Sequence, residues 1–301
     1  MLDWSSWISR TWAARPEGDE LKEEVVVGRK CSVIVFFVLI AVSSGVTWAG
    51  DGGFNGLPLG IDLPNPVDGS ETGYVRIADD DALEPQTLTI EAWIHPLGPG
   101  YNSEPVIVGK TMEGHSGSWI WAWVMIWHPG TGAVSAWLTH DVGAAGTSCS
   151  SIGSVAMGAS AHVAMTFDGT WLRVFIDGQL DNEAAASSAN VDYQGQDLAT
   201  FVGAGNFAPG WLRRFDGIID EVRIWDHARD AAEIAGQMNC ALSGDEPGLL
   251  AYYSFNMGDA RDDSDQGRDG VIEGTADYVN YSQDCMIHFD GFDDGTALAW
   301  N

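Results

Sequence analysis

Two Asp-Gly pairs constrain the fold of this chain more than any other feature of its sequence. They stand at residues 168–169 and 177–178, and each follows a short run of strand-forming residues, HVAMTF at 162–167 and WLRVFI at 171–176. Asp-Gly is a preferred sequence for the tight turns that join antiparallel strands. The pattern therefore predicts β-hairpins in this part of the chain.

The same alternation of strands and turns recurs along most of the sequence. Residues 86–95 (QTLTIEAWIH) alternate, so that Leu88 and Ile90 share one face of a strand while Thr89 and Glu91 share the other. Further strands are predicted at residues 198–202, 217–225 and 249–255. Many short strands separated by turns are typical of an antiparallel β-sandwich.

One segment has helical character instead. Residues 230–238 (DAAEIAGQM) begin with Asp230, a favoured N-cap residue, and Glu233 stands at the capping-box position. We therefore expect an all-β sandwich that carries one short helix.

The composition supports a folded domain and argues against nucleic-acid binding. The chain has 301 residues, with 14 Lys+Arg against 43 Asp+Glu and a formal net charge of −29. Such a chain repels phosphate backbones, so we expect no nucleic-acid partner. Hydrophobic residues make up 45% of the chain and aromatic residues 11%, which is enough for a real core.

Residues 31–49 have the pattern of an export signal. An uncharged apolar run follows Arg29 and Lys30 and ends with small residues near Ala49. We expect cleavage after Ala49 and a secreted or cell-surface protein. The alternative is a retained anchor, the one case in which we expect contact with a membrane. Residues 1–30 are an N-terminal extension, either a long leader or the result of a misassigned start at Met1.

Three cysteines follow the export segment: Cys149, Cys240 and Cys285. An exported protein can oxidise its cysteines, and an odd count leaves at least one thiol free or paired with another molecule. We predict a Cys240–Cys285 disulfide, because both residues flank the C-terminal segment.

Four segments, taken in order, resemble the laminin-G-like jelly roll of the concanavalin A-like lectin/glucanase superfamily. The resemblance implies two curved antiparallel sheets in a domain spanning residues 50–275, followed by a tail at 276–301. The tail's last residues, 288–301, are similar to a short C-terminal pattern of exported bacterial proteins. The resembling segments are LTIEAWIHP (88–96), AHVAMTFDGTWLRVFIDGQL (161–180), FDGIIDEVRIWDHARDAAEI (215–234) and GLLAYYSFNMGDARDDSDQGRDG (248–270).

The carboxylates do not form the pattern that glycoside hydrolysis needs. A retaining glucanase uses two carboxylates about 5–5.5 Å apart, and glucanase relatives place them in a Glu-x-Asp-x-Glu type of run that residues 50–301 lack. Asp220 and Glu221 are adjacent and therefore face opposite ways on a strand. Asp181 and Glu183 share a face, without a third partner. We predict no catalytic residues and no enzyme activity, with a divergent glycoside hydrolase as a remaining alternative.

Calcium is the metal that suits this chain best, because it prefers carboxylate and carbonyl oxygens. The resemblance implies a structural calcium held by Asp220 in the last long strand, with a partner at the Asp68 turn. The other interpretation is that Asp220 only accepts hydrogen bonds from backbone amides. The acidic segment at residues 259–270 lacks EF-hand spacing and is predicted to be a solvated turn.

Tryptophans are concentrated in residues 118–127 (SWIWAWVMIW). Strand alternation would place the tryptophans of this run on one face, and the next predicted strand adds another tryptophan. Such a face is either core or a flat aromatic surface that stacks on sugar rings. The candidate ligand-binding residues are Trp119, Trp121, Trp123 and Trp137.

Together these features predict a non-catalytic, exported binding module. Its expected partner is a glycan or a cell-surface polymer, and its expected cofactor is a structural calcium. The alternative is an adhesion or surface protein that binds protein partners through the same fold.

Overall fold

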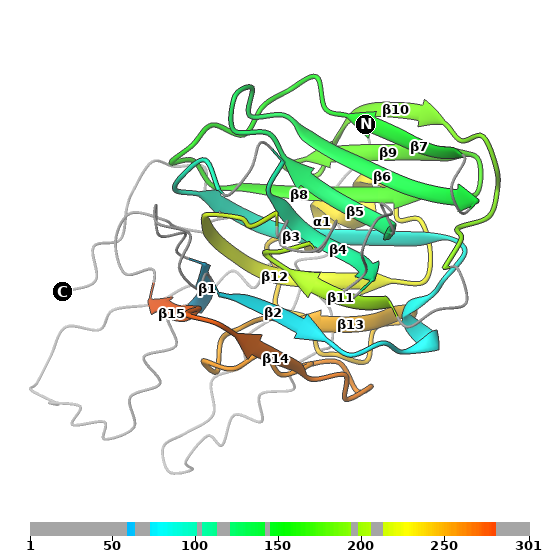
Figure 1. The fold of residues 1–301 in the computed structure, drawn as a ribbon. Coiled ribbons are helices and arrows are strands. Elements are labelled where there is room, and N and C mark those ends of the chain that lie inside the picture. The colour runs from blue at the N-terminus through cyan, green and yellow to red at the C-terminus, as the bar shows by residue number, and fades with distance from the viewer. Residues whose placement is uncertain are drawn as a thin grey trace, which may run out of the picture. The chain divides into compact units, whose positions relative to one another are not determined.

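Antiparallel strands build two sheets that face each other across a hydrophobic core (Figure 1). The computed structural model describes residues 59–63, 73–100, 104–112, 121–141, 145–193, 198–205 and 213–280. All of them belong to the second of the two compact units into which the chain divides, Val35–Asn301. The predicted export segment, Asp68, Trp119 and Cys285 lie outside the described residues.

The larger sheet has eight strands. Their order is β10-β9-β8-β3-β12-β1-β15, and β13 also pairs with β12. Their bounds are β1 Leu59–Leu63, β3 Leu88–Pro96, β8 Ala161–Phe167, β9 Trp171–Ile176, β10 Gln179–Ala185, β12 Gly217–Trp225, β13 Leu249–Tyr253 and β15 Asp277–Asn280. Strand β15 pairs with β1 and lies beyond residue 275, where the tail was predicted to begin.

The second sheet has seven strands in the order β14-β2-β11-β4-β5-β6-β7. Their bounds are β2 Tyr74–Ile77, β4 Val106–Met112, β5 Trp121–Trp127, β6 Val134–Asp141, β7 Ala145–Ser150, β11 Leu198–Val202 and β14 Gly270–Glu273, and a 3-10 turn, η1, spans Asp81–Leu83. The predicted fold class, an all-β jelly-roll sandwich of two antiparallel sheets, is confirmed.

The Asp-Gly pairs form the predicted hairpin turns. Strand β8 pairs with β9, and β9 pairs with β10, both antiparallel. At the second turn both Asp177 and Gly178 have positive φ angles, 49° and 71°. This left-handed backbone matches the twist of the flanking strands, and Gly adopts it without steric cost.

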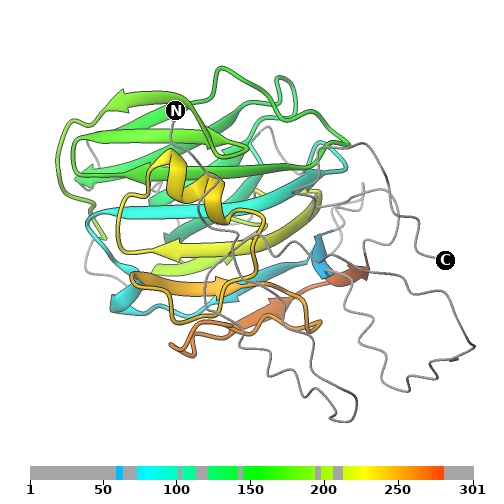
Figure 2. The same ribbon diagram turned by 180° about the vertical axis from the view of Figure 1, so that it is seen from behind.

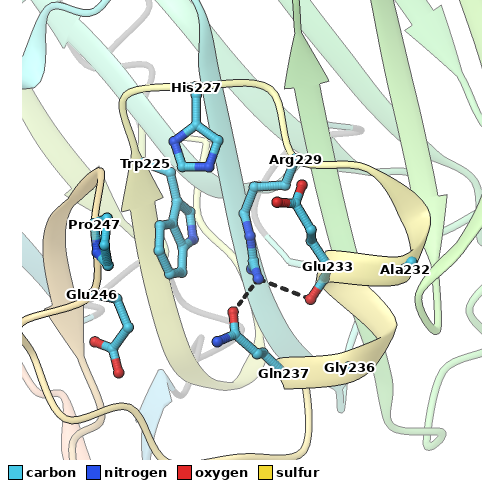
Figure 3. Close-up of a pocket in the computed structure, with 9 residues that line it drawn as sticks. All are labelled: Trp225, His227, Arg229, Ala232, Glu233, Gly236, Gln237, Glu246 and Pro247. Carbon is cyan, nitrogen blue, oxygen red and sulfur yellow. Dashed lines mark hydrogen bonds between the residues drawn. The ribbon is translucent and has the colours of Figure 1, made fainter. Parts of the chain in front are cut away.

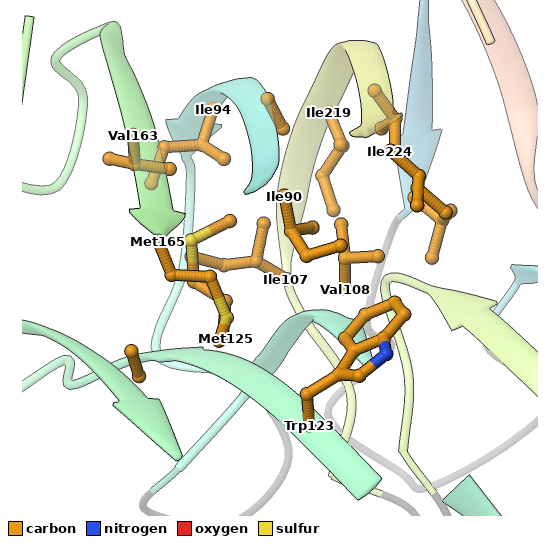
Figure 4. Close-up of a cluster of buried hydrophobic side chains, with 14 of the residues drawn as sticks. Ile90, Ile94, Ile107, Val108, Trp123, Met125, Val163, Met165, Ile219 and Ile224 are labelled. Atoms are coloured by element: carbon orange, nitrogen blue, oxygen red, sulfur yellow. The ribbon is translucent and has the colours of Figure 1, made fainter. Parts of the chain in front are cut away.

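Alternation along the strands decides which side chains enter the core. In β3, Leu88, Ile90, Ala92 and Ile94 belong to the central cluster, as predicted. Figure 4 shows Ile90 and Ile94 from this strand meeting Met165 of β8 and Trp123 of β5. Side chains from both sheets therefore fill one continuous core.

The predicted helix is present as α1, Ala231–Gln237. Asp230 accepts a hydrogen bond from the Glu233 amide, and the Glu233 side chain accepts one from the Asp230 amide, so the capping box is confirmed. Ile234 packs on Ala164 and Phe175. Figure 2 shows α1 lying across the outer side of the eight-stranded sheet. No helix within the described part of the chain is long and apolar enough to span a membrane.

Candidate functional site

A β-bulge divides the tryptophans of β5 between the two faces of the seven-stranded sheet. Lys110 of β4 pairs with Trp123, but Thr111 pairs with Trp121, so Ala122 is an extra residue in β5. Beyond a bulge, strict alternation no longer holds. Trp123 points into the core, whereas Trp121 packs with the outward residues Val124 and Ile126.

The prediction that Trp121 and Trp123 share one face is therefore wrong. Trp123 is fully buried within the sandwich, together with Met125 and Trp127. It contributes to packing and is not available to a ligand. A bulge leaves no mark in the apolar pattern of this strand, because both of its faces are apolar.

Trp121 and Trp137 form a pair on the outer side of the sheet. Their ring centroids are 6.2 Å apart and their planes lie at 89°, an edge-to-face contact. Both rings are partly exposed and rest on Val106, Val124 and Ile126. Aromatic pairs prefer this geometry, so the two indoles hold each other in a fixed orientation.

Hydroxyl and imidazole groups lie on the same side of the sheet. Ser135 Oγ is 2.7 Å from both His128 Nε2 and Ser150 Oγ. Ser148 of β7 pairs directly with Trp137 and is exposed. Burial lowers the pKa of His128, so this imidazole is neutral at neutral pH and can both donate and accept hydrogen bonds.

A second aromatic group continues the same outer side on β2 and β11. The rings of Tyr74 and Phe201 lie 5.8 Å apart, and the Arg214 guanidinium lies 5.6 Å from the Tyr74 ring centroid. We call the outer side of the seven-stranded sheet, from Tyr74 and Phe201 to Trp121 and Trp137, the aromatic face. Phe201 is buried beneath this face, whereas Tyr74, Trp121 and Trp137 are partly exposed. Partly exposed rings beside hydroxyl groups are the chemistry that a sugar ring requires.

Residues 68–235 match the family model described as the concanavalin A-like lectin/glucanases superfamily (Laminin_G_3). The chain belongs to this superfamily. The family resemblance predicted from the sequence is confirmed. No curated protein matches the chain.

Several solved structures are similar to this fold at low sequence identity. A candidate carbohydrate-binding protein from Bacteroides ovatus aligns at a TM-score of 0.56 and 17% identity, over 74% of this chain. The present chain spans 60% of the length of that structure. A heptameric SAP-like pentraxin from Limulus polyphemus aligns at 0.46 and 12% identity, covering 61% of this chain and 82% of that one. The CBM40 of a Ruminococcus gnavus IT-sialidase, bound to α2,3-sialyllactose, aligns at 0.46 and 16% identity, covering 58% and 94%.

Asp220, the predicted calcium ligand of this superfamily member, is buried in β12. Its Oδ1 accepts a hydrogen bond of 2.8 Å from the Glu221 amide, and its Oδ2 has no hydrogen-bond partner within the described ranges. Burial, followed by the charge of Glu221, raises its pKa well above the usual range. The free oxygen could ligate a cation, but Glu221 is already bonded to Arg223 and Tyr252.

The described residues alone do not complete a calcium site. Among them, no group of three or more His, Cys, Asp or Glu side chains is arranged to hold a metal ion. Asp68, the proposed second ligand, lies outside the described ranges. Calcium binding by Asp220 and Asp68 therefore stays a prediction.

The carboxylates considered for hydrolysis are held apart by a second bulge. Asp181 falls at the register shift between Leu180 and Asn182 in β10, so it does not share a face with Glu183 in the predicted way. Asp181 accepts hydrogen bonds from the amides of Ile152 and Gly153. Glu183 pairs with Arg173 at 3.0 Å. Each carboxylate thus has a separate structural partner.

The acidic segment at residues 259–270 is a turn with exposed residues, as predicted, but one of its carboxylates is buried. Asp262 is 5% exposed, and its carboxylate accepts backbone hydrogen bonds from Tyr252, Ser264 and Arg268 at 2.8–3.0 Å. A buried carboxyl group is tolerated when backbone amides donate hydrogen bonds to its oxygens in this way. Asp262 therefore fixes this loop onto β13.

Cys149 has a free thiol, buried on β7. Burial raises its pKa to about 11, so the thiol is protonated and unreactive at neutral pH. The predicted Cys240–Cys285 pair cannot be placed, since Cys285 lies outside the described residues, and it stays a prediction.

A pocket of about 280 Å³ lies beside α1, which covers the outer side of the eight-stranded sheet (Figures 2 and 3). Arg229 crosses it, with its guanidinium 4.2 Å from the Trp225 ring centroid and a 2.7 Å bond to the buried Glu91. Trp225 Nε1 also donates to Glu91 at 2.9 Å. Sequence reasoning missed this network, because Glu91 and Arg229 are far apart in the chain and neither belongs to a motif.

Proposed function

We propose that this superfamily member is a non-catalytic binding module that recognises a glycan through its aromatic face. The observation that carries the proposal is the partly exposed edge-to-face pair of Trp121 and Trp137. This pair is fixed on a sheet and lies beside a group of hydroxyls. Sites on sheet strands position their ligands more precisely than sites on loops.

The two kinds of group on this face have complementary roles toward a sugar. An indole covers the C–H side of a pyranose ring and removes apolar surface from water. The exposed Ser148 and Ser150 offer hydroxyls, while the buried Ser135 links Ser150 to the neutral imidazole of His128. Stacking would supply affinity, while hydroxyl contacts would select among sugars.

The positions of the carboxylates support the absence of catalysis in this proposal. Hydrolysis needs an acid and a second carboxylate on either side of one glycosidic bond. Asp181 and Glu183 instead bind a loop and Arg173. The shared fold with the Bacteroides ovatus protein, described as a candidate carbohydrate-binding protein, is consistent with binding alone.

An exported location and a structural calcium complete the proposal. The export-type sequence at residues 31–49 supports the first, since an extracellular polymer is then within reach. The unpartnered Oδ2 of Asp220 supports the second. Chelation would then lower stability, and it would reduce glycan binding only through the stability of the domain.

A glycan array tests the proposal, probed with the purified protein in calcium and in chelator. We expect binding to a restricted set of glycans, with loss of signal when Trp121 is replaced by Ala. An array without hits in either condition would contradict the proposal. Turnover of β-glucans by the same preparation would contradict its non-catalytic part.

A further inference from the structure

Lys110 is a lysine with no exposed surface inside the sandwich. It lies on β4 and pairs with Trp123 of β5 and Thr200 of β11, so its side chain points to the core side of the sheet, away from the aromatic face. Lysine is almost never fully buried unless it is paired. A lysine can therefore be buried at this position only because other groups pair with its amino group.

Two carboxylates and one carbonyl surround the amino group. Lys110 Nζ lies 2.7 Å from Asp79 Oδ1 and 2.8 Å from the carbonyl oxygen of Leu198. Glu84 Oε1 is 3.7 Å away. Asp79 lies two residues after the end of β2, and Glu84 directly follows η1, so three separate segments bring these groups together.

Glu84 differs from an ordinary surface carboxylate. Burial raises its pKa, with the charges of Asp79 and Asp81 acting in the same direction and that of Lys110 opposing them. A carboxyl group whose pKa is raised, 3.7 Å from an amine that also contacts a second carboxylate, is placed to transfer protons between them.

We propose that Lys110 and Asp79 form an intramolecular amide bond, with Glu84 as the group that transfers protons. A fully buried amine held in contact with a partly buried carboxyl group is a preorganised pair of reactants. Orientation of this kind reaches effective molarities of about 10⁵–10⁸ M. Amide formation also removes the charge of the fully buried Lys110 and with it the desolvation cost of that charge.

The reaction balances without an added reagent. The ammonium of Lys110 first passes a proton to Asp79, which gives a neutral amine and a neutral acid. The Nζ lone pair attacks Asp79 Cγ, and a new C–N bond forms. Glu84 donates its proton to the departing hydroxyl and receives one from nitrogen. The Cγ–O bond breaks and one water molecule leaves.

The surroundings suit both the departing water and the product. The side chains of Asp79 and Glu84 are 23% and 21% exposed, so the water has a route to solvent. The amide keeps one N–H, which can still donate to the Leu198 carbonyl. The bond would join β2 to β4 across β11, the strand between them, and it would not involve the glycan-binding face.

Mass spectrometry of the denatured full chain tests the proposal. We expect a mass lower by one water molecule than the sequence requires. No Lys or Arg lies between Arg76 and Lys110 or between Lys110 and Arg173, so trypsin would release the cross-linked partners in residues 77–173 and the unmodified chain as residues 77–110 and 111–173. An acylated Lys110 blocks cleavage after it, and fragmentation would locate the bond.

Three variants separate the amide bond from other losses of mass. Lys110→Arg keeps the charge but cannot react, so its full mass is expected. Glu84→Gln should retain both reactants and slow or abolish the bond. Asp79→Asn should lose ammonia in place of water and reach the same product as the natural chain. An unmodified mass for the natural chain, with normal cleavage after Lys110, would show an ion pair only and overturn the proposal.

Discussion

Asp220 shows how one buried carboxylate links stability to pH. Its pKa is raised in the folded protein, chiefly by burial, and the ordinary value is about 3.9. A raised pKa gives stability that is fully present below the unfolded pKa and is lost as pH rises through the folded pKa. The loss is about 1.4 kcal/mol for each pH unit in that window.

We therefore predict that Asp220→Asn raises the free energy of unfolding at neutral pH in the presence of chelator. The amide has the same shape and no charge to desolvate. Urea unfolding from acidic to neutral pH measures the effect, and the slope seen for the natural chain in that window should shrink in the variant. Parallel pH profiles for the two proteins would contradict this interpretation.

Calcium binding by Asp220 can be tested separately. If Asp220 is a ligand, Asp220→Ala lowers the melting temperature in calcium by more than it does in chelator, because only the natural chain gains binding energy. Equal shifts in the two conditions would mean that Asp220 acts through hydrogen bonds alone.

The strands were predictable because their sequences alternate, and the bulges were not. In β3 and β8–β9 the apolar period and the Asp-Gly turns predict the observed faces and register. In β5 the extra residue Ala122 moves Trp121 outward, and in β10 the shift lies at Asp181. One inserted residue changes the face of every residue beyond it. The prediction that the tryptophans of β5 share one face was therefore wrong, although the strand itself was predicted correctly.

Helix α1 depends on a charge network that no local pattern reveals. Arg229 bonds to Glu91 of β3 and to the carbonyl of Glu233 on the helix. Both charged side chains are buried, at 3% and 0% exposure. Removing one partner of a buried pair leaves the other charge unpaired, which costs about 3–5 kcal/mol.

We accordingly predict that Arg229→Ala destabilises the protein by about 3–5 kcal/mol. Arg261→Ala is the matched control, because Arg261 is an exposed ion-pair residue at 45% exposure and its loss should change stability by no more than about 0.5 kcal/mol. Chemical denaturation measures both. Equal, small effects would show that the network does not hold α1 to the sheet.

At the scale of the whole molecule, the net charge of −29 acts on the folded state through self-repulsion. Screening reduces this repulsion, and the Debye length falls to about 3 Å in 1 M salt. We expect the melting temperature to rise from low salt to 1 M sodium chloride. A fall would mean that specific ion pairs outweigh the general repulsion.

The fold class and the family were accessible from the sequence because they depend on features spread over most of the chain. The site was accessible only in part. Trp121 and Trp137 were among the predicted residues, but their pairing depends on the bulge, and the hydroxyls of Ser135 and Ser150 join them only through the pairing of β6 with β7. Contacts between strands that are distant in the sequence form only when the sheet assembles, so a local sequence pattern does not predict them.

Calorimetric titration of a glycan from the array tests the central claim most directly. Trp121→Ala and Trp137→Ala should each weaken binding by about 10-fold or more, since losing a buried apolar side chain costs about 1.5–3 kcal/mol. Trp171→Ala is the control, because this tryptophan is 36% exposed on β9 of the other sheet. Loss of binding in the first two variants alone is the predicted result. Unchanged affinity in both, or equal loss in all three, would contradict binding at the aromatic face.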